Sequence, residues 1–215
     1  MARVAVANRV TIPVQQNLIL RSDEFNHASW TQIALSALNA NAAVAPDGTT
    51  TADQLVEDSA ASAHMLSQSV AGGLIPNGGE YAWSVFAKAG ARTWLLVDSC
   101  AGLSQSWFDL ANGTLGSIAG SIRPVYRTIE AASLYFSGAP AGWYRCTIAG
   151  MSFEAAFPQM ELRMANADLS TGYTGDGTSD LFLWRAQLAE ARNWAGVPTA
   201  TTTTVVDTGP IRSKP

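Results

Sequence analysis

The chain has 215 residues and a formal net charge of −4; 47% of its residues are hydrophobic and 14% are charged. An acidic chain lacks the basic surface that neutralises phosphate groups, which excludes nucleic acid as an expected partner. No stretch stays apolar over the ~20 residues that a membrane helix needs and no signal peptide opens the chain, so we expect no membrane insertion and synthesis in a cytoplasm.

The first residues alternate between apolar and polar types, which is typical of an extended strand. Apolar side chains occupy every second position from Val4 to Val14 except at Asn8, and Pro13 restricts pairing. We expect an N-terminal extended arm over residues 1–16 that completes a sheet or lies across a neighbouring protein, where backbone hydrogen bonds hold it. The alternative is an ordinary first strand of the domain.

Strand signals fill the middle of the chain. Residues 80–87 alternate, with Tyr81, Trp83 and Val85 on one face. Residues 92–98 follow after a short break, so the two segments are predicted to form a hairpin. Residues 51–58 are compatible with either a helical turn or a strand, and residues 188–194 with a short turn. Further strands are expected at 106–110, 142–150, 159–164 and 181–188.

Turn sequences separate these strands. The pair Asn112-Gly113 supplies the positive φ angles that a primed hairpin turn requires. Short strands between strong turns predict a β-sandwich or a closed barrel. The other turn sequences are Pro46-Asp47-Gly48, Pro76-Asn77-Gly78-Gly79 and Gly175-Asp176-Gly177.

The last residues are rich in threonine and valine and nearly uncharged. We expect a C-terminal extended arm over residues 196–215, leaving residues 17–195 for the sandwich; a frayed tail is the alternative. The apolar arm residues expected to take part in assembly are Val4, Val6, Val10, Ile12, Val205 and Val206.

The two cysteines, Cys100 and Cys146, match no zinc or redox spacing. Cys146 falls in an alternating strand, where a reduced and buried thiol is expected. A disulfide between the two is the alternative.

Catalytic motifs are absent from the sequence. The two histidines, His27 and His64, belong to no metal or triad pattern, and there is no nucleophile elbow or phosphate-binding glycine loop. Paired carboxylates could hydrolyse glycosides, but among seventeen acidic residues such candidates arise by chance. We therefore expect no enzyme. The strand carboxylates are Asp98, Asp109, Glu154 and Glu161.

Aromatic side chains are the remaining candidates for recognition, because sugar rings stack on flat aromatic faces. Trp107 lies beside Phe108, and a regular strand points one of the two outward. We name Trp107 and Tyr173 as exposed candidates for glycan binding. The alternating tryptophans are expected to fill the core instead; they are Trp83, Trp143 and Trp184.

The loop at residues 175–180 carries Asp176 and Asp180, together with carbonyl groups that a calcium ion accepts as ligands. These two carboxylates are the candidate metal ligands. The alternative is a plain hydrogen-bonded Asp turn, which needs no cofactor.

In their order along the chain, several stretches resemble bacteriophage structural proteins that contain carbohydrate-binding-like jelly-roll domains. The resemblance covers roughly residues 17–200, and none of its motifs is catalytic. The matching stretches include N-L-I-L-R-S-D-E-F-N-H-A-S-W-T (17–31), A-P-D-G-T-T-T-A-D-Q-L-V-E-D (45–58), G-W-Y-R-C-T-I-A (142–149) and Y-T-G-D-G-T-S-D-L-F-L-W-R-A-Q-L-A-E (173–190).

The resemblance implies an all-β fold, an antiparallel two-sheet jelly-roll sandwich, of the kind found in tail fibres, tailspikes and head-associated proteins. It also implies structural roles for Asn17, Leu18 and Trp30. The family often closes with tyrosine-isoleucine-proline-threonine, where this chain has residues 196–199, Gly-Val-Pro-Thr. The closing contact is therefore expected to differ.

Two functions follow from these features. The first is a non-enzymatic virion structural or accessory protein, a capsid decoration or tail-associated component, that docks on capsid or tail subunits through its arms and a sandwich face. Only 14% of the residues are charged, against about 25% in an ordinary domain, which fits a protein whose surface is partly covered by a partner. A homo-oligomer, a trimer or a dimer, is expected. The alternative is a lectin-like receptor-binding module that recognises host surface glycans.

Overall fold

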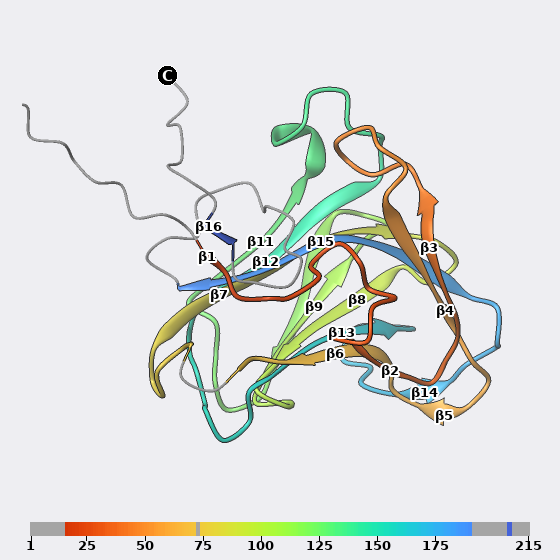
Figure 1. Ribbon diagram of the computed structural model, residues 1–215. Coiled ribbons are helices and arrows are strands. Elements are labelled where there is room, and N and C mark those ends of the chain that lie inside the picture. The colour runs from red at the N-terminus through yellow and green to blue at the C-terminus, as the bar shows by residue number, and fades with distance from the viewer. Residues whose placement is uncertain (1–15, 72–73, 191–205, 208–215) are drawn as a thin grey trace, which may run out of the picture.

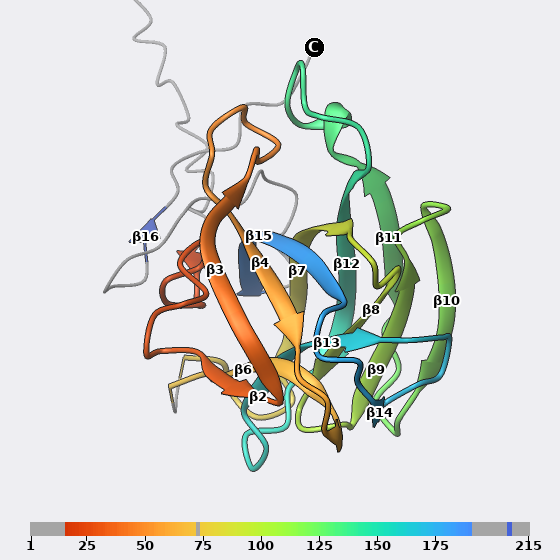
Figure 2. The same cartoon turned by 90° about the vertical axis from the view of Figure 1, so that its right-hand side faces the viewer.

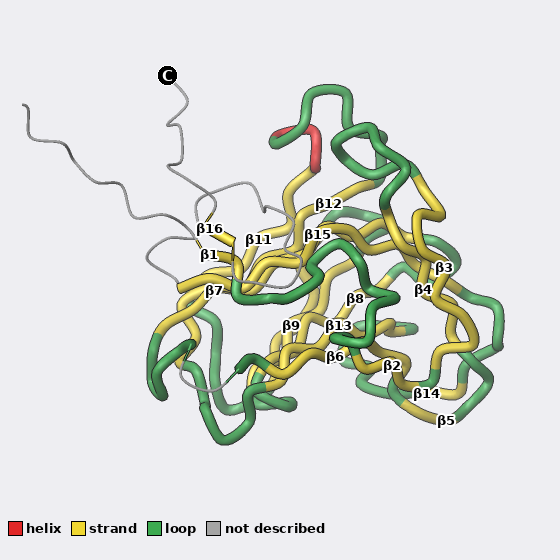
Figure 3. Tube along the Cα trace, viewed as in Figure 1, coloured by secondary structure: helices red, strands yellow, loops and turns green. Residues whose placement is uncertain are grey.

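Two six-stranded antiparallel sheets pack face to face in the computed structural model, which describes residues 16–71, 74–190 and 206–207 (Figure 1). Sheet I has the order β10-β9-β8-β13-β6-β2, and sheet II the order β11-β12-β7-β15-β4-β3. The chain passes repeatedly between the sheets, and the predicted jelly-roll sandwich is confirmed (Figures 2 and 3).

The strands of sheet I, in chain order, are β2 (Thr31–Ile33), β6 (His64–Ser69), β8 (Trp94–Ser99), β9 (Ser104–Asp109), β10 (Thr114–Ala119) and β13 (Gln159–Ala165). Those of sheet II are β3 (Leu35–Ala43), β4 (Ala52–Glu57), β7 (Glu80–Ala89), β11 (Tyr126–Ala131), β12 (Trp143–Ser152) and β15 (Asp180–Glu190). Two small pairs complete the fold, β1 (Gln16–Asn17) with β16 (Val206–Asp207) and β5 (Ala61–Ser62) with β14 (Tyr173–Thr174). A 3₁₀ turn, η1, spans Ala132–Leu134.

The alternation of side chains explains how the core forms. Along β12, Tyr144, Cys146 and Ile148 face the main core between the sheets, while Trp143 faces outward. The outward residues of β7, β12 and β15 do not all meet water, because Trp143 and Trp184 join a second apolar cluster on the outer face of sheet II. The expected burial of the three alternating tryptophans is confirmed.

The predicted hairpin of residues 80–98 is wrong. Strand β7 pairs with β12 and β15 in sheet II, whereas β8 pairs with β9 and β13 in sheet I. Both segments are strands, but the break between them carries the chain from one sheet to the other, and Arg92 N donates to Asp180 O there. A short break alone does not distinguish a hairpin from such a crossover.

Three smaller predictions have different outcomes. Residues 51–58 contain a strand, β4. The turn expected over residues 188–194 is wrong for its first part, because β15 continues to Glu190, and residues 191–194 lie outside the described residues. The β9–β10 hairpin forms as predicted, yet only Gly113 has a positive φ (64°), so the turn is not a primed one. The reason is the Asp109 carboxylate, which accepts hydrogen bonds from Ala111 N and Asn112 N and shapes a longer turn.

The expected arms lie largely outside the described residues, including Val4, Val6, Val10, Ile12 and Val205. Val206 lies in β16, whose backbone pairs antiparallel with β1, and Leu18 N then donates to Leu188 O in β15 at 2.8 Å. Where it is described, the C-terminal segment therefore pairs with its own chain. Cys100 and Cys146 are both buried and free of a disulfide.

Asn17 and Trp30 have the structural roles that the resemblance implies. The Asn17 side chain donates to Ala186 O and accepts from Leu188 N, and the Trp30 indole donates to Arg21 O. No helix within the described ranges is long and apolar enough to cross a membrane.

Candidate functional site

One end of the sandwich is organised around Glu57, the last residue of β4, whose carboxylate is fully buried. It accepts hydrogen bonds from Arg92 Nε (2.8 Å) and Nη2, from the Tyr173 hydroxyl, and from Asp176 N (2.8 Å). Buried carboxylates persist when every oxygen has a donor. We call this group, Glu57 with Arg92, Tyr173 and Asp176, the Glu57 clamp.

The clamp changes the protonation of its own members. Burial alone would raise the pKa of Glu57, but the hydrogen bonds from Arg92, Tyr173 and Asp176 N outweigh it and lower that pKa. Burial and the neighbouring Glu57 carboxylate raise the pKa of the Tyr173 hydroxyl, so Tyr173 stays a hydrogen-bond donor. The clamp thus holds a negative carboxylate against neutral and positive donors.

Tyr173 was expected to offer a free ring, and the structure places it half-buried instead. The Arg92 guanidinium carbon lies 4.9 Å from the ring centroid, and the His64 ring lies 4.7 Å away. With its hydroxyl donated to Glu57 and its ring covered by two neighbours, Tyr173 acts as a structural link between β14 and β4. Its glycan-binding role stays a prediction.

The expected exposure of Trp107 is wrong. Phe108 faces the core, so Trp107 does point outward from sheet I, yet only 1% of it is exposed. The loop after β13 covers it: Ser170 O accepts the indole N–H at 2.9 Å, and Asp168 binds Ser117 on β10. Strand alternation was interpreted correctly, but the distant loop could not be foreseen. Glycan binding by this residue also stays a prediction.

The two candidate metal ligands are already used by protein donors. Asp176 accepts hydrogen bonds from Ser179 and Thr178, first among them the Ser179 hydroxyl at 2.6 Å, which lowers its pKa. Asp180 accepts from Gln54 Nε2 at 2.5 Å and Ala91 N at 2.9 Å. Among the described residues no group of three or more His, Cys, Asp or Glu side chains could hold a metal ion. Calcium binding there stays a prediction.

Two strand carboxylates do come together. Asp98 on β8 and Glu161 on β13 are direct cross-strand neighbours, and Arg163 forms ion pairs with both, at 3.0 Å to Asp98. Burial, offset only in part by Arg163, raises the pKa of Asp98 to about 6. Each carboxylate is buried and bound to the same guanidinium, an arrangement that serves packing on the outer face of sheet I.

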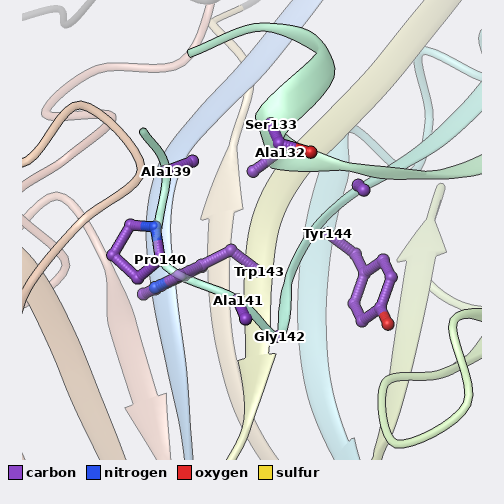
Figure 4. Close-up of a pocket in the computed structure, with 9 residues that line it drawn as sticks. Ala132, Ser133, Ala139, Pro140, Ala141, Gly142, Trp143 and Tyr144 are labelled. Atoms are coloured by element: carbon purple, nitrogen blue, oxygen red, sulfur yellow. The ribbon is translucent and has the colours of Figure 1, made fainter. Parts of the chain in front are cut away.

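A hollow of about 340 Å³ opens at the end of the sandwich where β11 and β12 are joined (Figure 4). The loop 44–51 between β3 and β4 lies at the same end (Figures 1 and 2), and Trp143 Nε1 donates to Val44 O at 3.0 Å. Small side chains predominate in its lining, which comprises Ala131, Ala132, Ser133, Ala139, Pro140, Ala141, Gly142, Trp143 and Tyr144.

Of the two aromatic residues that line this hollow, Trp143 and Tyr144, only Tyr144 is partly exposed. Trp143 is buried, whereas Tyr144 is half-buried, and in Figure 4 their side chains point to opposite sides of the chain. The β9–β10 turn supports the ring, since a Cβ on Gly113 would come within 2.6 Å of Tyr144 Cε1. The same Cβ would lie 2.9 Å from the Tyr144 hydroxyl oxygen, so the turn borders the ring and its tip. No described residue hydrogen-bonds to this hydroxyl, and Tyr144 therefore brings a partly exposed ring and an unpaired hydroxyl to the edge of the hollow.

Sequence reasoning missed this hollow, because it selected Trp107 and Tyr173 as the exposed aromatic residues and did not single out Tyr144. The available signal was the run of small residues S-G-A-P-A-G over 137–142, which leaves space before the aromatic pair Trp143-Tyr144 at the start of the next strand. The exposed Leu134 on η1 marks the same loop.

No family model and no curated protein matches the chain. Among solved structures, it is similar to the C-terminal family 22 carbohydrate-binding module of Clostridium thermocellum Xyn10B, with 13% identity and a TM-score of 0.48 over 84% of this chain and 96% of that one. The CBM22-2 xylan-binding domain of Paenibacillus barcinonensis Xyn10C gives 10% identity and 0.41 over 82% and 98%.

A larger Clostridium thermocellum protein, the Xyn10B CBM22-1–GH10 modules complexed with xylohexaose, gives 16% identity and a TM-score of 0.39. The match covers 83% of this chain and 28% of that one. Values this low identify neither a family nor a ligand for this chain.

Proposed function

We propose that this chain is a non-catalytic glycan-binding module that holds a sugar in the hollow beside Tyr144. The observation that carries the proposal is the juxtaposition, in one hollow of about 340 Å³, of an accessible tyrosine ring with a hydroxyl free of described partners. Sugars present both apolar C–H faces and hydroxyl groups, so a binding site for them needs these two kinds of surface together.

The remaining lining fits such a ligand. Small-molecule sites are concave and mostly apolar, with a few polar groups that fix orientation. Ser133 contributes a second hydroxyl, and the small side chains from Ala139 to Gly142 leave room for a bound sugar. Tyrosine suits this position because it pairs an apolar ring with a polar tip.

The test is a glycan screen followed by calorimetry on the full chain. Ala141→Leu fills the hollow from an exposed position, and Ala40→Leu adds the same side chain at an exposed position on β3. We expect Ala141→Leu to weaken binding at least about tenfold, a loss of about 1.4 kcal/mol. The Ala40→Leu variant should bind like the wild type.

Equal binding by Ala141→Leu and the wild type would mean that the sugar binds elsewhere on the molecule, and would contradict the assignment of the hollow. A screen without any bound glycan would contradict the function itself. Circular dichroism of each variant confirms that the sandwich is folded in both cases.

A virion is the setting that we propose for this module, as part of a capsid decoration or a tail. The resemblance over residues 17–200 and the charge-poor composition support it. Because β16 pairs with β1 of the same chain, we assign the functional contact to the sandwich and not to the C-terminal arm. Mass spectrometry of purified particles tests this setting: the chain must be present in stoichiometric amounts, and its absence would contradict it.

A further inference from the structure

Lys88 lies next to the hollow. It is on β7, where its register partners are Trp143 on β12 and Phe182 on β15. Its stem runs beside Gly142, a lining residue with φ of +83°, because a Cβ built on Gly142 would lie 3.7 Å from Lys88 Cε and 3.9 Å from Cγ. These distances place Lys88 Cε beside Gly142, at the edge of the hollow that Trp143 also lines.

The Lys88 ammonium group has no counter-ion within the described part of the chain, where no ion pair and no side-chain hydrogen bond involves it. Other cations are used internally: Arg92 pairs with Glu57 and Arg163 with Asp98. Lys88 is half-buried, so its stem is packed while its charge stays available. Lys214, the other lysine of the sequence, lies outside the described residues.

The lining of the hollow itself carries no charged side chain. A carboxylate brought into it by a ligand would therefore meet no repelling group among the lining residues and one available ammonium at the rim. A charge-assisted hydrogen bond between an ammonium and a carboxylate is about twice as strong as a neutral one. Lys88 thereby adds a preference that the ring and the hydroxyls alone do not supply.

We infer that the hollow selects acidic glycans, and that Lys88 is the residue that recognises the carboxylate of a uronic acid. This inference rests on the proposed function, since it names the ligand class of the same site. Lysine acts as a point charge on a flexible stem, so the selectivity is for charge rather than for one fixed geometry. The preference should weaken as salt rises, because an exposed pair is screened.

The experiment compares oligomers of galacturonate, glucuronate and mannuronate with their methyl esters, which keep each sugar and remove its charge. Calorimetry is run on the wild type, on Lys88→Met, which keeps the apolar stem, and on Lys88→Arg, which keeps the charge. Arg123→Met is the matched control, since Arg123 is an exposed cation that donates only to Ile118 O among its described partners.

We expect the wild type to bind at least one acid about tenfold more tightly than its ester, a difference of about 1.4 kcal/mol. Lys88→Met should bind acid and ester alike, at the affinity that the wild type has for the ester. Lys88→Arg should retain most of the preference, and Arg123→Met all of it.

The failures of the two proposals are distinguishable. Equal binding of acid and ester by the wild type, or an acid preference that survives in Lys88→Met, would overturn the role of Lys88 and leave glycan binding standing. Binding of neutral glycans alone would do the same. Absence of binding by every acid, ester and screened glycan would overturn the proposed function and this inference together.

Discussion

Two half-buried tyrosines at different places in the sandwich show how neighbours decide what an aromatic residue does. Tyr173 donates its hydroxyl to the buried Glu57, and its ring lies against Arg92 and His64. Tyr144 has a ring beside an open hollow and a hydroxyl without a described partner. Both tyrosines line a hollow, of about 370 Å³ at Tyr173 and about 340 Å³ at Tyr144. The difference lies in the hydroxyl, which Tyr173 donates to Glu57 and which in Tyr144 has no described partner.

The difference teaches that residue type and strand position do not locate a binding surface. Tyr173 lies in a loop-rich region, where exposure is the usual expectation. A buried carboxylate from a strand 116 residues earlier in the chain gives it a structural role. Tyr144 lies in a strand that faces the core, but it sits near the strand end, where the loop 132–142 leaves space.

The largest expected effect comes from removing the centre of the clamp. Glu57→Ala leaves Arg92, the Tyr173 hydroxyl and Asp176 N without their common acceptor, and breaking a buried ion pair costs about 3–5 kcal/mol. Urea unfolding measures the free energy of unfolding. The control Glu24→Ala, which breaks an exposed pair with Arg21, should cost less than about 1 kcal/mol. Similar costs for both variants would contradict the clamp.

The same substitution in the two tyrosines sharpens the comparison. Tyr173→Phe removes a hydrogen bond to a charged group and should cost about 1.5–3 kcal/mol of unfolding free energy. Tyr144→Phe keeps its ring and loses a hydroxyl with no described partner, so its stability should change by less than about 0.5 kcal/mol while glycan affinity falls. A larger loss of stability in Tyr144→Phe than in Tyr173→Phe would contradict the structural role assigned to Tyr173.

Acidification should lower the free energy of unfolding through the Glu57 clamp, by less than the Glu57→Ala substitution does. The folded-state pKa of Glu57 is lowered, so its contribution to stability is complete above its ordinary value of 4.5 and is lost as pH falls through the folded-state pKa. The slope cannot exceed about 1.4 kcal/mol per pH unit for one proton. The measurement is urea unfolding between pH 3 and 7 in wild type and Glu57→Gln, and only the wild type should show this loss.

Asp98 contributes with the opposite sign, because its folded-state pKa is raised to about 6. Its contribution is favourable at low pH and declines as pH rises from about 4 to 6, so it partly masks the loss at Glu57. Repeating both series in an Asp98→Asn background separates the two. A pH profile that Glu57→Gln leaves unchanged would show that the clamp carboxylate does not favour its charged form.

The sequence was sufficient for the fold class because strand alternation and turns are local. The two faces of β12 and the place of Trp83 in the main core followed from a period of two, whereas Trp143 and Trp184 are buried by a second cluster on the outer face of sheet II. The hairpin of β7 and β8 was wrong because both strands look alike whether the chain turns back or crosses between sheets. That choice depends on long-range pairing with β12 and β13.

The candidate site was harder to predict, because exposure depends on contacts between distant segments. Trp107 points outward as its strand requires, but the loop carrying Ser170 covers it. Tyr173 was recognised as a residue of interest, and its partner Glu57 had no local signal in the sequence. The hollow beside Tyr144 depends on small side chains in a loop, and the alternation of residues in strands carries no information about such a loop.

The pairing of β1 with β16 has a mechanical consequence. These two strands lie side by side, so the first and the last described residues of the chain, Gln16 and Asp207, are neighbours (Figure 1). A pull on Gln16 and Asp207, which are register partners, would load the hydrogen bonds of this short pair one after another and then the contacts of the first segment with β15, where Leu18 N donates to Leu188 O. We expect the hollow beside Tyr144 to keep its shape under such a pull, because it is lined by β12 and the loop before it and not by this pair.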